Sequence, residues 1–221
     1  MTDPSPTDTT RAKPSCVELS ATVAAKLCHD FISPASAIVS GVDLLDDPES
    51  QDMREDALSL IADSARKLAA HLAFARVAFG ASAAADTFDS RDLKALVEGV
   101  FAHVRPDLDW AVGMESVQKP VARALLNLSQ IGAGILPTGG LARLVAGVED
   151  GFVVAAVEAE GAKVRLRPEV AEGLRGEALG DGLPGYWVQA YFLSQLVAEA
   201  GGTVDFAVSE ERVVVRARLP V

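Results

Sequence analysis

The chain has 221 residues, a formal net charge of −11 and a sequence pI of about 4.7. This length accommodates one domain of ordinary size with a smaller one beside it, since domains commonly have about 100 to 200 residues. The acidic balance argues against nucleic acid as a partner, because such binding draws largely on counterions released by basic side chains. No stretch approaches the roughly 18 consecutive apolar residues of a membrane-spanning helix, so we expect no membrane partner either.

The N-terminal residues 1–15 are rich in Pro, Thr, Ser and Asp and have no hydrophobic period. Such a composition cannot bury enough apolar surface to offset the entropy lost on ordering, so we expect a disordered tail over residues 1–15. The same stretch lacks the apolar run of a signal peptide. The two cysteines, Cys16 and Cys28, form no CxxC pair. A cytoplasmic location is therefore expected.

Residues 16–84 have the pattern of two amphipathic helices. Apolar side chains recur at steps of three and four residues over two stretches, which are separated by the helix-breaking residues 46–50. The first stretch contains Leu27, Phe31, Ala35, Ile38, Val42 and Leu45, and the second contains Leu58, Ile61, Ala65, Leu68, Leu72, Ala75 and Phe79. The pattern predicts an antiparallel helical hairpin. Because one hairpin leaves a long apolar stripe uncovered, we expect a homodimer in which two hairpins form a four-helix bundle.

Residues 85–221 differ from the hairpin in that shorter helices alternate with strands. Helices are predicted from Asp89 or Ser90 to about residue 104, from Pro120 to about residue 135, from Pro168, and over about 186–200. Strands are predicted near 110–112 and over 141–149, 152–160, 163–167, 203–209 and 212–220, with a tight turn at Asp150 and Gly151. The chain is therefore predicted to have an α+β fold, in which an α/β sandwich with helices on one face of a mostly antiparallel sheet follows the hairpin.

One histidine of the first predicted helix stands out through its neighbours. On a helical wheel His29 lies opposite the apolar stripe and should point to solvent. A lone exposed histidine is usually a solvated surface residue, but here Asp30 follows it, Ser33 lies one turn further along the same face, and Pro34 interrupts the helix interior. A proline at that place costs about 3 kcal/mol or more and should bend the helix, which indicates that the site is used.

The chemistry that fits His29 is the capture of a phosphoryl group by a neutral ring nitrogen with a free lone pair. Asp30 is placed to accept a hydrogen bond from the other ring nitrogen, or to take up its proton, and so to fix the tautomer. Ser33 is placed to orient the ring or to contact a phosphoryl oxygen. His71, at the flank of the second apolar face, and His103, near a helix end, are weaker candidates for a functional histidine.

Residues 29–34 resemble the H-box of bacterial sensor histidine kinases, in which an acidic residue follows the phosphorylated histidine and a proline comes five residues after it. Residues 122–136 look like the helix that bears the N-box, and residues 185–206 look like the final helix and strand of the kinase catalytic domain. The resemblance implies a sandwich of the histidine kinase catalytic (GHKL) type. Two motifs depart from the pattern: Ile131 replaces the second N-box asparagine, a magnesium ligand, and residues 158–162 lack the adenine-reading aspartate.

A kinase-like chain without those motifs resembles the ChpT type of dimeric histidine phosphotransferase. That resemblance implies that His29 receives a phosphoryl group from the aspartate of a receiver domain, such as that of a hybrid histidine kinase, and passes it to the aspartate of a response regulator. It also implies that the chain binds no ATP, no other cofactor and no metal, since the receiver brings the Mg²⁺ ion.

Four further residues are candidates for contact with a receiver. Arg165 and Arg167 alternate on one face of the predicted strand 163–167 and offer positive charge to an acidic receiver surface, although charges on an edge strand also serve to prevent aggregation. Ile32 and Ser36 lie close to the exposed side of the candidate phosphoacceptor. Two other functions remain open: an active histidine autokinase with a divergent nucleotide site, and a non-catalytic dimeric scaffold for regulators.

Overall fold

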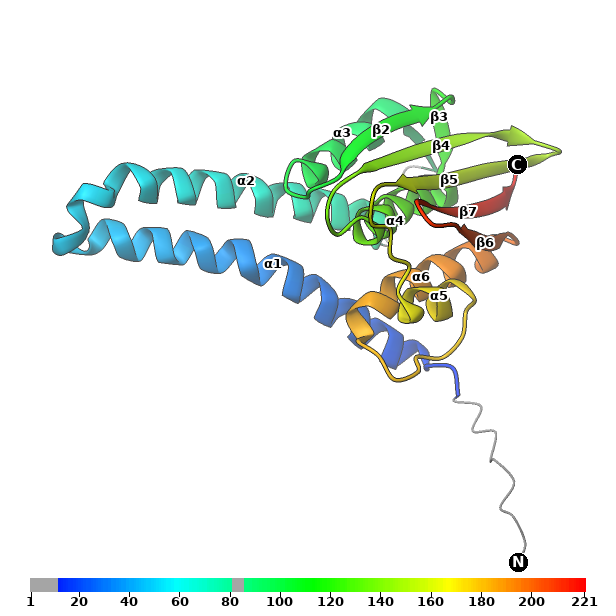
Figure 1. Cartoon of the computed structure of the whole chain (residues 1–221), viewed down its shortest axis with the longest axis horizontal. Helices are drawn as coiled ribbons and strands as arrows, with labels where there is room; N and C mark the ends of the chain where they lie inside the picture. Colours follow the sequence, from blue (N-terminus) through cyan, green and yellow to red (C-terminus); the bar gives the residue numbers. More distant parts are fainter. Residues whose placement is uncertain (1–11, 81–85) are drawn as a thin grey trace, which may run out of the picture.

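The computed structural model describes residues 12–80 and 86–221. A helical hairpin projects from a body in which helices pack on a sheet (Figure 1). The hairpin consists of two long helices, which are joined by a short 3₁₀ helix: α1 (Cys16–Asp46), η1 (Pro48–Met53) and α2 (Arg54–Ala78). Within the described residues, no helix combines the length and the apolar character that crossing a membrane requires.

Local hydrogen bonds fix the N-terminal end of α1. Ser15 accepts a hydrogen bond from the N–H of Glu18, and the carboxylate of Glu18 accepts one from the N–H of Ser15. Residues 12–14 of the predicted tail have no regular secondary structure, whereas residues 1–11 lie outside the described part of the chain. The helix therefore begins directly after the stretch that is predicted as a tail.

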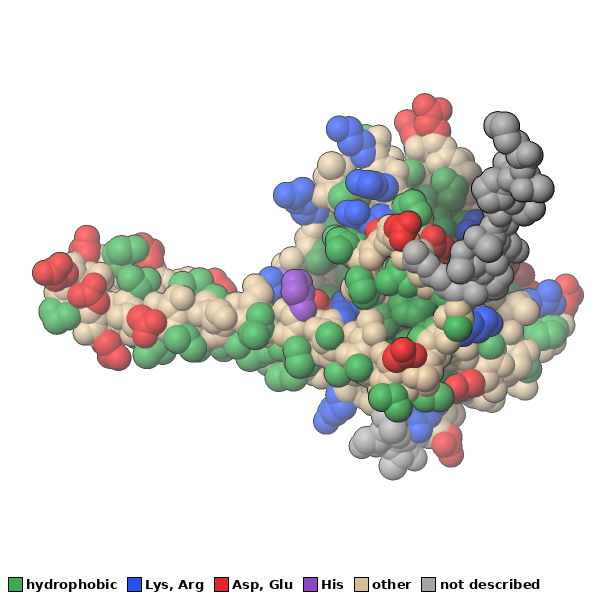
Figure 2. Space-filling view, turned by 90° about the horizontal axis from the view of Figure 1, so that it is seen from below, with side chains coloured by type: hydrophobic (Ala, Val, Ile, Leu, Met, Phe, Trp, Pro, Cys, Tyr) green, Lys and Arg blue, Asp and Glu red, His purple; other side chains and the backbone are tan. Residues whose placement is uncertain are grey.

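A close contact between the hairpin helices lies at Gly41 of α1. A Cβ atom on this glycine would lie 2.6 Å from Cγ1 of Ile61 and 3.2 Å from the carbonyl oxygen of Ala57, so a larger residue would force the helices apart. Elsewhere the hairpin keeps apolar side chains exposed, and they appear in green along it in Figure 2. They include Val39, Val42, Leu58, Leu60 and Leu72. The uncovered apolar stripe that the sequence predicts is thus present on the single chain.

The body is built on a five-stranded sheet with the strand order β2-β4-β5-β7-β6. Its strands are β2 (Asp107–Val112), β4 (Leu141–Glu149), β5 (Phe152–Glu160), β6 (Thr203–Val208) and β7 (Arg212–Pro220). β2 runs parallel to β4, and the other neighbours are antiparallel. The turn between β4 and β5 has positive φ at both Asp150 and Gly151, as a two-residue type I′ hairpin requires. The predicted mostly antiparallel sheet is confirmed.

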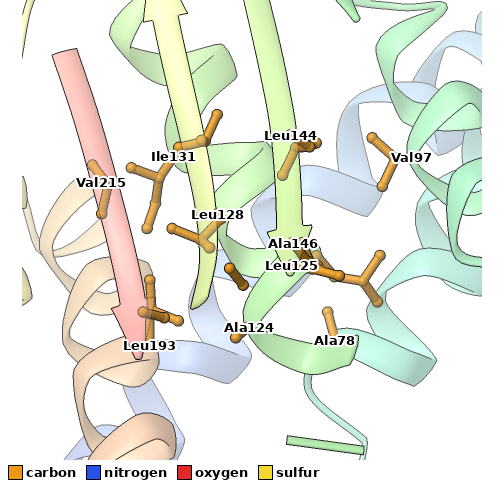
Figure 3. Close-up of a cluster of buried hydrophobic side chains, with 14 of the residues drawn as sticks. Ala78, Val97, Ala124, Leu125, Leu128, Ile131, Leu144, Ala146, Leu193 and Val215 are labelled. Carbon is orange, nitrogen blue, oxygen red and sulfur yellow. The ribbon is translucent and has the colours of Figure 1, made fainter. Parts of the chain in front are cut away.

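Within the described part of the chain, four helices accompany this sheet. They are α3 (Ser90–Phe101), which Asp89 caps, α4 (Lys119–Ile135), α5 (Pro168–Leu174) and α6 (Pro184–Glu199). The core lies between α4 and the sheet, where Leu128 and Ile131 face Leu144 of β4 and Val215 of β7 (Figure 3). Burial of these side chains supplies most of the driving force for the packing. The predicted α+β fold, a helical hairpin followed by a sandwich, is confirmed.

One predicted strand is wrong. Residues 163–167 lie between β5 and α5 without strand structure, so Arg165 and Arg167 do not alternate on a sheet. Both edges of β5 are already occupied, by β4 and β7, so the segment cannot pair with the strand that precedes it. Instead the N–H of Arg165 donates to the carbonyl of Ile135 at the end of α4, at 2.9 Å.

Two short strands are not predicted by the sequence. β1 (Thr87–Asp89) and β3 (Ser116–Gln118) form a separate antiparallel pair before α3 and α4. Three residues are too few for an alternating pattern to be visible, so the pairing partner decides that these segments are strands. The predicted boundary between residues 84 and 85 falls in the part of the chain that the structure does not describe.

Candidate functional site

His29 lies on α1 with 87% of its side chain exposed. This confirms the prediction that the ring points to solvent. Its Nδ1 atom lies 3.4 Å from Oδ1 of Asp30, which is the predicted hydrogen-bonding partner. An ionised carboxylate can only accept a hydrogen bond, so this contact needs the proton on Nδ1 and leaves the lone pair on Nε2 free. The arrangement presents a nucleophilic nitrogen to the outside of the molecule.

The second oxygen of Asp30 is bound by a residue that sequence reasoning missed. Nζ of Lys26 lies 2.6 Å from Oδ2 of Asp30, and their side chains are only 17% and 23% exposed, respectively. The two residues are one helical turn apart on α1, and the sequence alone could have indicated Lys26 through this spacing. The result is a row of contacts from an ammonium group through a carboxylate to an exposed imidazole.

These residues line a cavity of about 660 Å³ between the hairpin and the body. Lys26, His29 and Asp30 form its wall on α1. The body contributes residues of α3 and α4, the start of α6, and the segment that carries Arg165 and Arg167. The structure therefore brings the predicted phosphoacceptor and both predicted receiver-binding arginines to one cavity, although the arginines follow far along the chain.

One of the two arginines that line this cavity, Arg167, packs against an aromatic ring. The guanidinium carbon of Arg167 lies 4.1 Å from the centroid of the Tyr186 ring, within the range of a cation–π contact. Arg167 also immediately precedes α5, as its N-cap residue. The guanidinium is thus held at the body side of the cavity.

The other predicted site residues lie beside the cavity but are not part of its lining. Ile32 is 64% exposed, Ser33 and Ser36 are also exposed, and Pro34 is buried within α1. The hydrogen-bonding partner of the His29 ring is Asp30 and not Ser33. The three exposed residues therefore belong to the outer surface around the histidine.

His71 of α2 has a stronger connection to the site than its sequence position indicates. It is half-buried and lines the same cavity as His29. Burial lowers the pKa of His71, and the nearby Asp30 carboxylate opposes this shift. The imidazole of His71 is therefore predominantly neutral at neutral pH.

One polar residue of α4, the helix that resembles the N-box helix, has a structural role. Asn127 of α4 is fully buried, and its amide nitrogen donates to the carbonyl of Arg123 at 2.8 Å and to that of Ala78 at 3.4 Å. Its side-chain oxygen accepts a hydrogen bond from Gln189. The side chain of Asn127 therefore links α4 to α2 and α6, and its amide groups are used in these bonds. Over residues 12–80 and 86–221, no group of three or more His, Cys, Asp and Glu side chains could hold a metal ion.

Comparison with known proteins identifies close relatives. Residues 90–212 match the family model of the histidine phosphotransferase C-terminal domain. The protein phosphotransferase ChpT of Brucella abortus (strain 2308) is 33% identical over 203 residues, which cover 90% of this chain and 95% of that protein. A solved bacterial phosphotransferase is 32% identical with a TM-score of 0.82, over 93% of this chain and 98% of that one. A histidine kinase domain from Erythrobacter litoralis EL346 is 13% identical over 86% of this chain and 95% of that one, with a TM-score of 0.47.

Proposed function

Because the chain belongs to the histidine phosphotransferase family, we propose that it is a phosphorelay protein that carries a phosphoryl group on His29. The group comes from the aspartate of a receiver domain and passes to the aspartate of a downstream response regulator. The observation that carries this proposal is the exposed His29 ring, hydrogen-bonded through Nδ1 to Asp30 at the edge of a cavity. An exposed ring can be reached by the aspartate of another protein.

The transfer needs little from the chain beyond position and charge. Phosphoryl transfer proceeds in line, so the attacking nitrogen must face phosphorus opposite the leaving aspartate oxygen. Asp30 holds the ring in the tautomer that directs Nε2 outward. Ser33, exposed one turn along α1, is placed near an incoming phosphoryl oxygen.

The surface around His29 is the proposed docking site for the receiver. Ile32 and Ser36 offer contacts on the hairpin, and Arg165 and Arg167 offer positive charge on the body. Receiver domains carry acidic residues around the phosphorylated aspartate, so the two arginines complement such a surface. In this proposal the Mg²⁺ ion belongs to the receiver, and the donors are receivers of hybrid histidine kinases.

The proposal excludes ATP as the direct source of the phosphoryl group. Asn127 is occupied by bonds within the body, and Ile131 provides no metal ligand. In the glycine-rich segment before α6, the N–H of Gly180 donates to Glu172 at 2.9 Å and that of Leu183 to Glu169 at 3.4 Å. The carboxylates occupy amides that would otherwise be available to phosphate, and their negative charge would repel it.

The deciding experiment measures transfer from a phosphorylated receiver domain to the full chain. We expect acid-labile, base-stable phosphate on the unsubstituted protein and none on the His29→Ala variant. Because His29 is exposed, this variant should stay folded, and circular dichroism checks that it does. A His103→Ala variant, which changes a histidine outside the proposed site, should accept phosphate normally.

A parallel incubation with radiolabelled ATP separates the relay from an autokinase. The expected result is no label on the chain without a phosphorylated receiver. Label that appears on His29 from ATP alone would overturn the relay proposal. Phosphate that remains on the His29→Ala variant would show that another residue is the acceptor.

A further inference from the structure

The ion pair between Lys26 and Asp30 differs from an ordinary surface pair of the same spacing. Lys94 and Glu98 of α3 are also four residues apart, but their charged atoms are 3.5 Å apart and both side chains are about half exposed. In the Lys26–Asp30 pair the distance is 2.6 Å and both side chains are mostly covered. Water screens a covered pair less, so its charges act more strongly on neighbouring groups.

The neighbouring group is the phosphoacceptor. Asp30 uses Oδ2 for Lys26 and Oδ1 for His29, so the lysine determines how the carboxylate is rotated toward the ring. His71 lines the same cavity, but burial lowers its pKa and keeps it neutral. Lys26 is therefore the charged partner that holds Asp30 in place.

We infer that Lys26 is a positioning residue for phosphotransfer, which acts on His29 through Asp30. By binding one carboxylate oxygen it aims the other at Nδ1, so that Nδ1 keeps the proton and Nε2 keeps the lone pair. This inference rests on the proposed function of His29 as the phosphoacceptor. It adds a residue that need not touch the phosphoryl group or the receiver.

The chemistry shows what the lysine contributes. The lone pair of Nε2 forms the bond to phosphorus while the bond from phosphorus to the aspartate oxygen of the receiver breaks, and its electron pair leaves with that oxygen. Positive charge then develops on the imidazole ring of His29. The Nδ1 proton stays hydrogen-bonded to Asp30, whose negative charge offsets the charge of the ring. Without Lys26 the carboxylate is free to rotate away, and the ring populates the other neutral tautomer.

The first test is the tautomer of His29 in the full chain, measured by nitrogen NMR at a pH where the ring is neutral. In the unsubstituted protein we expect the proton mainly on Nδ1. In a Lys26→Met variant we expect the population to shift toward the proton on Nε2, and in Lys26→Arg we expect it to return. Lys94→Met, which removes the exposed pair on α3, is the matched control and should leave the tautomer unchanged.

The second test is the rate at which His29 is phosphorylated by phosphoramidate. In that reaction the P–N bond of the donor breaks and ammonia leaves, so no receiver has to dock. We expect Lys26→Met to be roughly ten- to hundredfold slower, the loss typical when the partner that orients a metal-binding histidine is removed. Lys26→Arg should recover most of the rate, and Lys94→Met should keep all of it.

Two results would overturn the inference. One is a Lys26→Met variant with an unchanged tautomer, because a slower rate would then not come from the orientation of the ring. The other is a shifted tautomer with an unchanged rate. A chain on which no phosphate appears at His29 from any receiver would contradict the proposed function instead, and the tautomer measurement tells the two failures apart because it needs no transfer.

Discussion

At the scale of single residues, the site combines one exposed and one half-buried histidine. His29 is open to solvent, whereas His71 faces the same cavity from α2 and is partly covered. Desolvation is the largest cause of the lowered pKa of His71, and electrostatic interactions with Lys67, His103 and Lys26 add to it. Asp30 opposes the shift. The cavity thus favours a neutral His71.

This environment predicts how stability depends on pH. Unfolding returns the pKa of His71 toward its ordinary value of 6.5. Between the lowered value and 6.5 the unfolded chain binds more protons than the folded one, so the free energy of unfolding falls as the pH drops through this interval. We expect the unsubstituted protein to lose more stability between about pH 7.5 and about pH 5 than a His71→Gln variant does. Urea unfolding over this range measures the difference.

The pH dependence of stability in the same two proteins can also contradict the role of His71. The two proteins should differ by a constant amount above the ordinary pKa of histidine, and this difference sets the reference. Equal losses of stability toward lower pH would mean that His71 does not contribute to the acid sensitivity.

At the scale of elements, α4 fixes the end of the hairpin to the body. The last carbonyl groups of a helix have no partner within it, and here side chains of α4 provide partners. Nε of Arg123 lies 3.2 Å from the carbonyl oxygen of Ala78, and Nη2 lies 3.4 Å from that of Phe79. Asn127 donates to the Ala78 carbonyl as well. A helix that resembles the N-box helix of a kinase therefore holds α2 in place.

We predict that Asn127→Ala lowers the free energy of unfolding by about 1 to 3 kcal/mol. The substitution removes hydrogen bonds and leaves the buried carbonyl of Ala78 with fewer partners. Denaturant unfolding checks this value. Ser129→Ala is the matched control, because this serine is also buried on α4 but its hydroxyl donates to the Leu126 carbonyl of its own helix. A loss no larger for Asn127→Ala than for Ser129→Ala would refute the proposed role.

The long elements were predictable from the sequence because their patterns repeat. The helical period over α1 and α2, and the turn residues Asp150 and Gly151 between β4 and β5, each indicate one structure. Residues 163–167 also alternate apolar and charged side chains, but β5, the strand that precedes them, is already paired on both sides, with β4 and β7. For β1 and β3 the partner strand decides, and three residues carry no visible period.

At the scale of the whole molecule, the cavity could not be predicted from the sequence. Asp30 is next to His29, and Lys26 is one turn away, so this part of the site can be predicted from spacing along a single helix. His71 and Arg165 reach the same cavity only because the hairpin packs against the body in one particular way. No pattern within either part specifies that arrangement, which depends on contacts such as those between α2 and α4.

The exposed stripe on the hairpin leads to the prediction of a homodimer. Three side chains of the predicted apolar faces, Val42, Leu58 and Leu72, remain 42%, 50% and 48% exposed, respectively, in the single chain. Burying one such side chain fully contributes about 1.5 to 3 kcal/mol, so covering the stripe with a second hairpin gives a substantial driving force. We propose that a second copy of the chain forms a four-helix bundle with this hairpin.

Light scattering coupled to size exclusion tests this prediction. The unsubstituted protein should have the mass of a dimer, and a Val42→Glu, Leu58→Glu double variant should shift toward the monomer, because a carboxylate in the bundle is costly without a partner. Val148→Glu is the matched control, since Val148 is also an exposed valine, 60% accessible, but lies on β4 far along the chain from the hairpin. A monomeric unsubstituted protein at micromolar concentration would refute the bundle. Dissociation by Val148→Glu would instead place the interface on the sheet, and His29 would then act from a hairpin that no second copy covers.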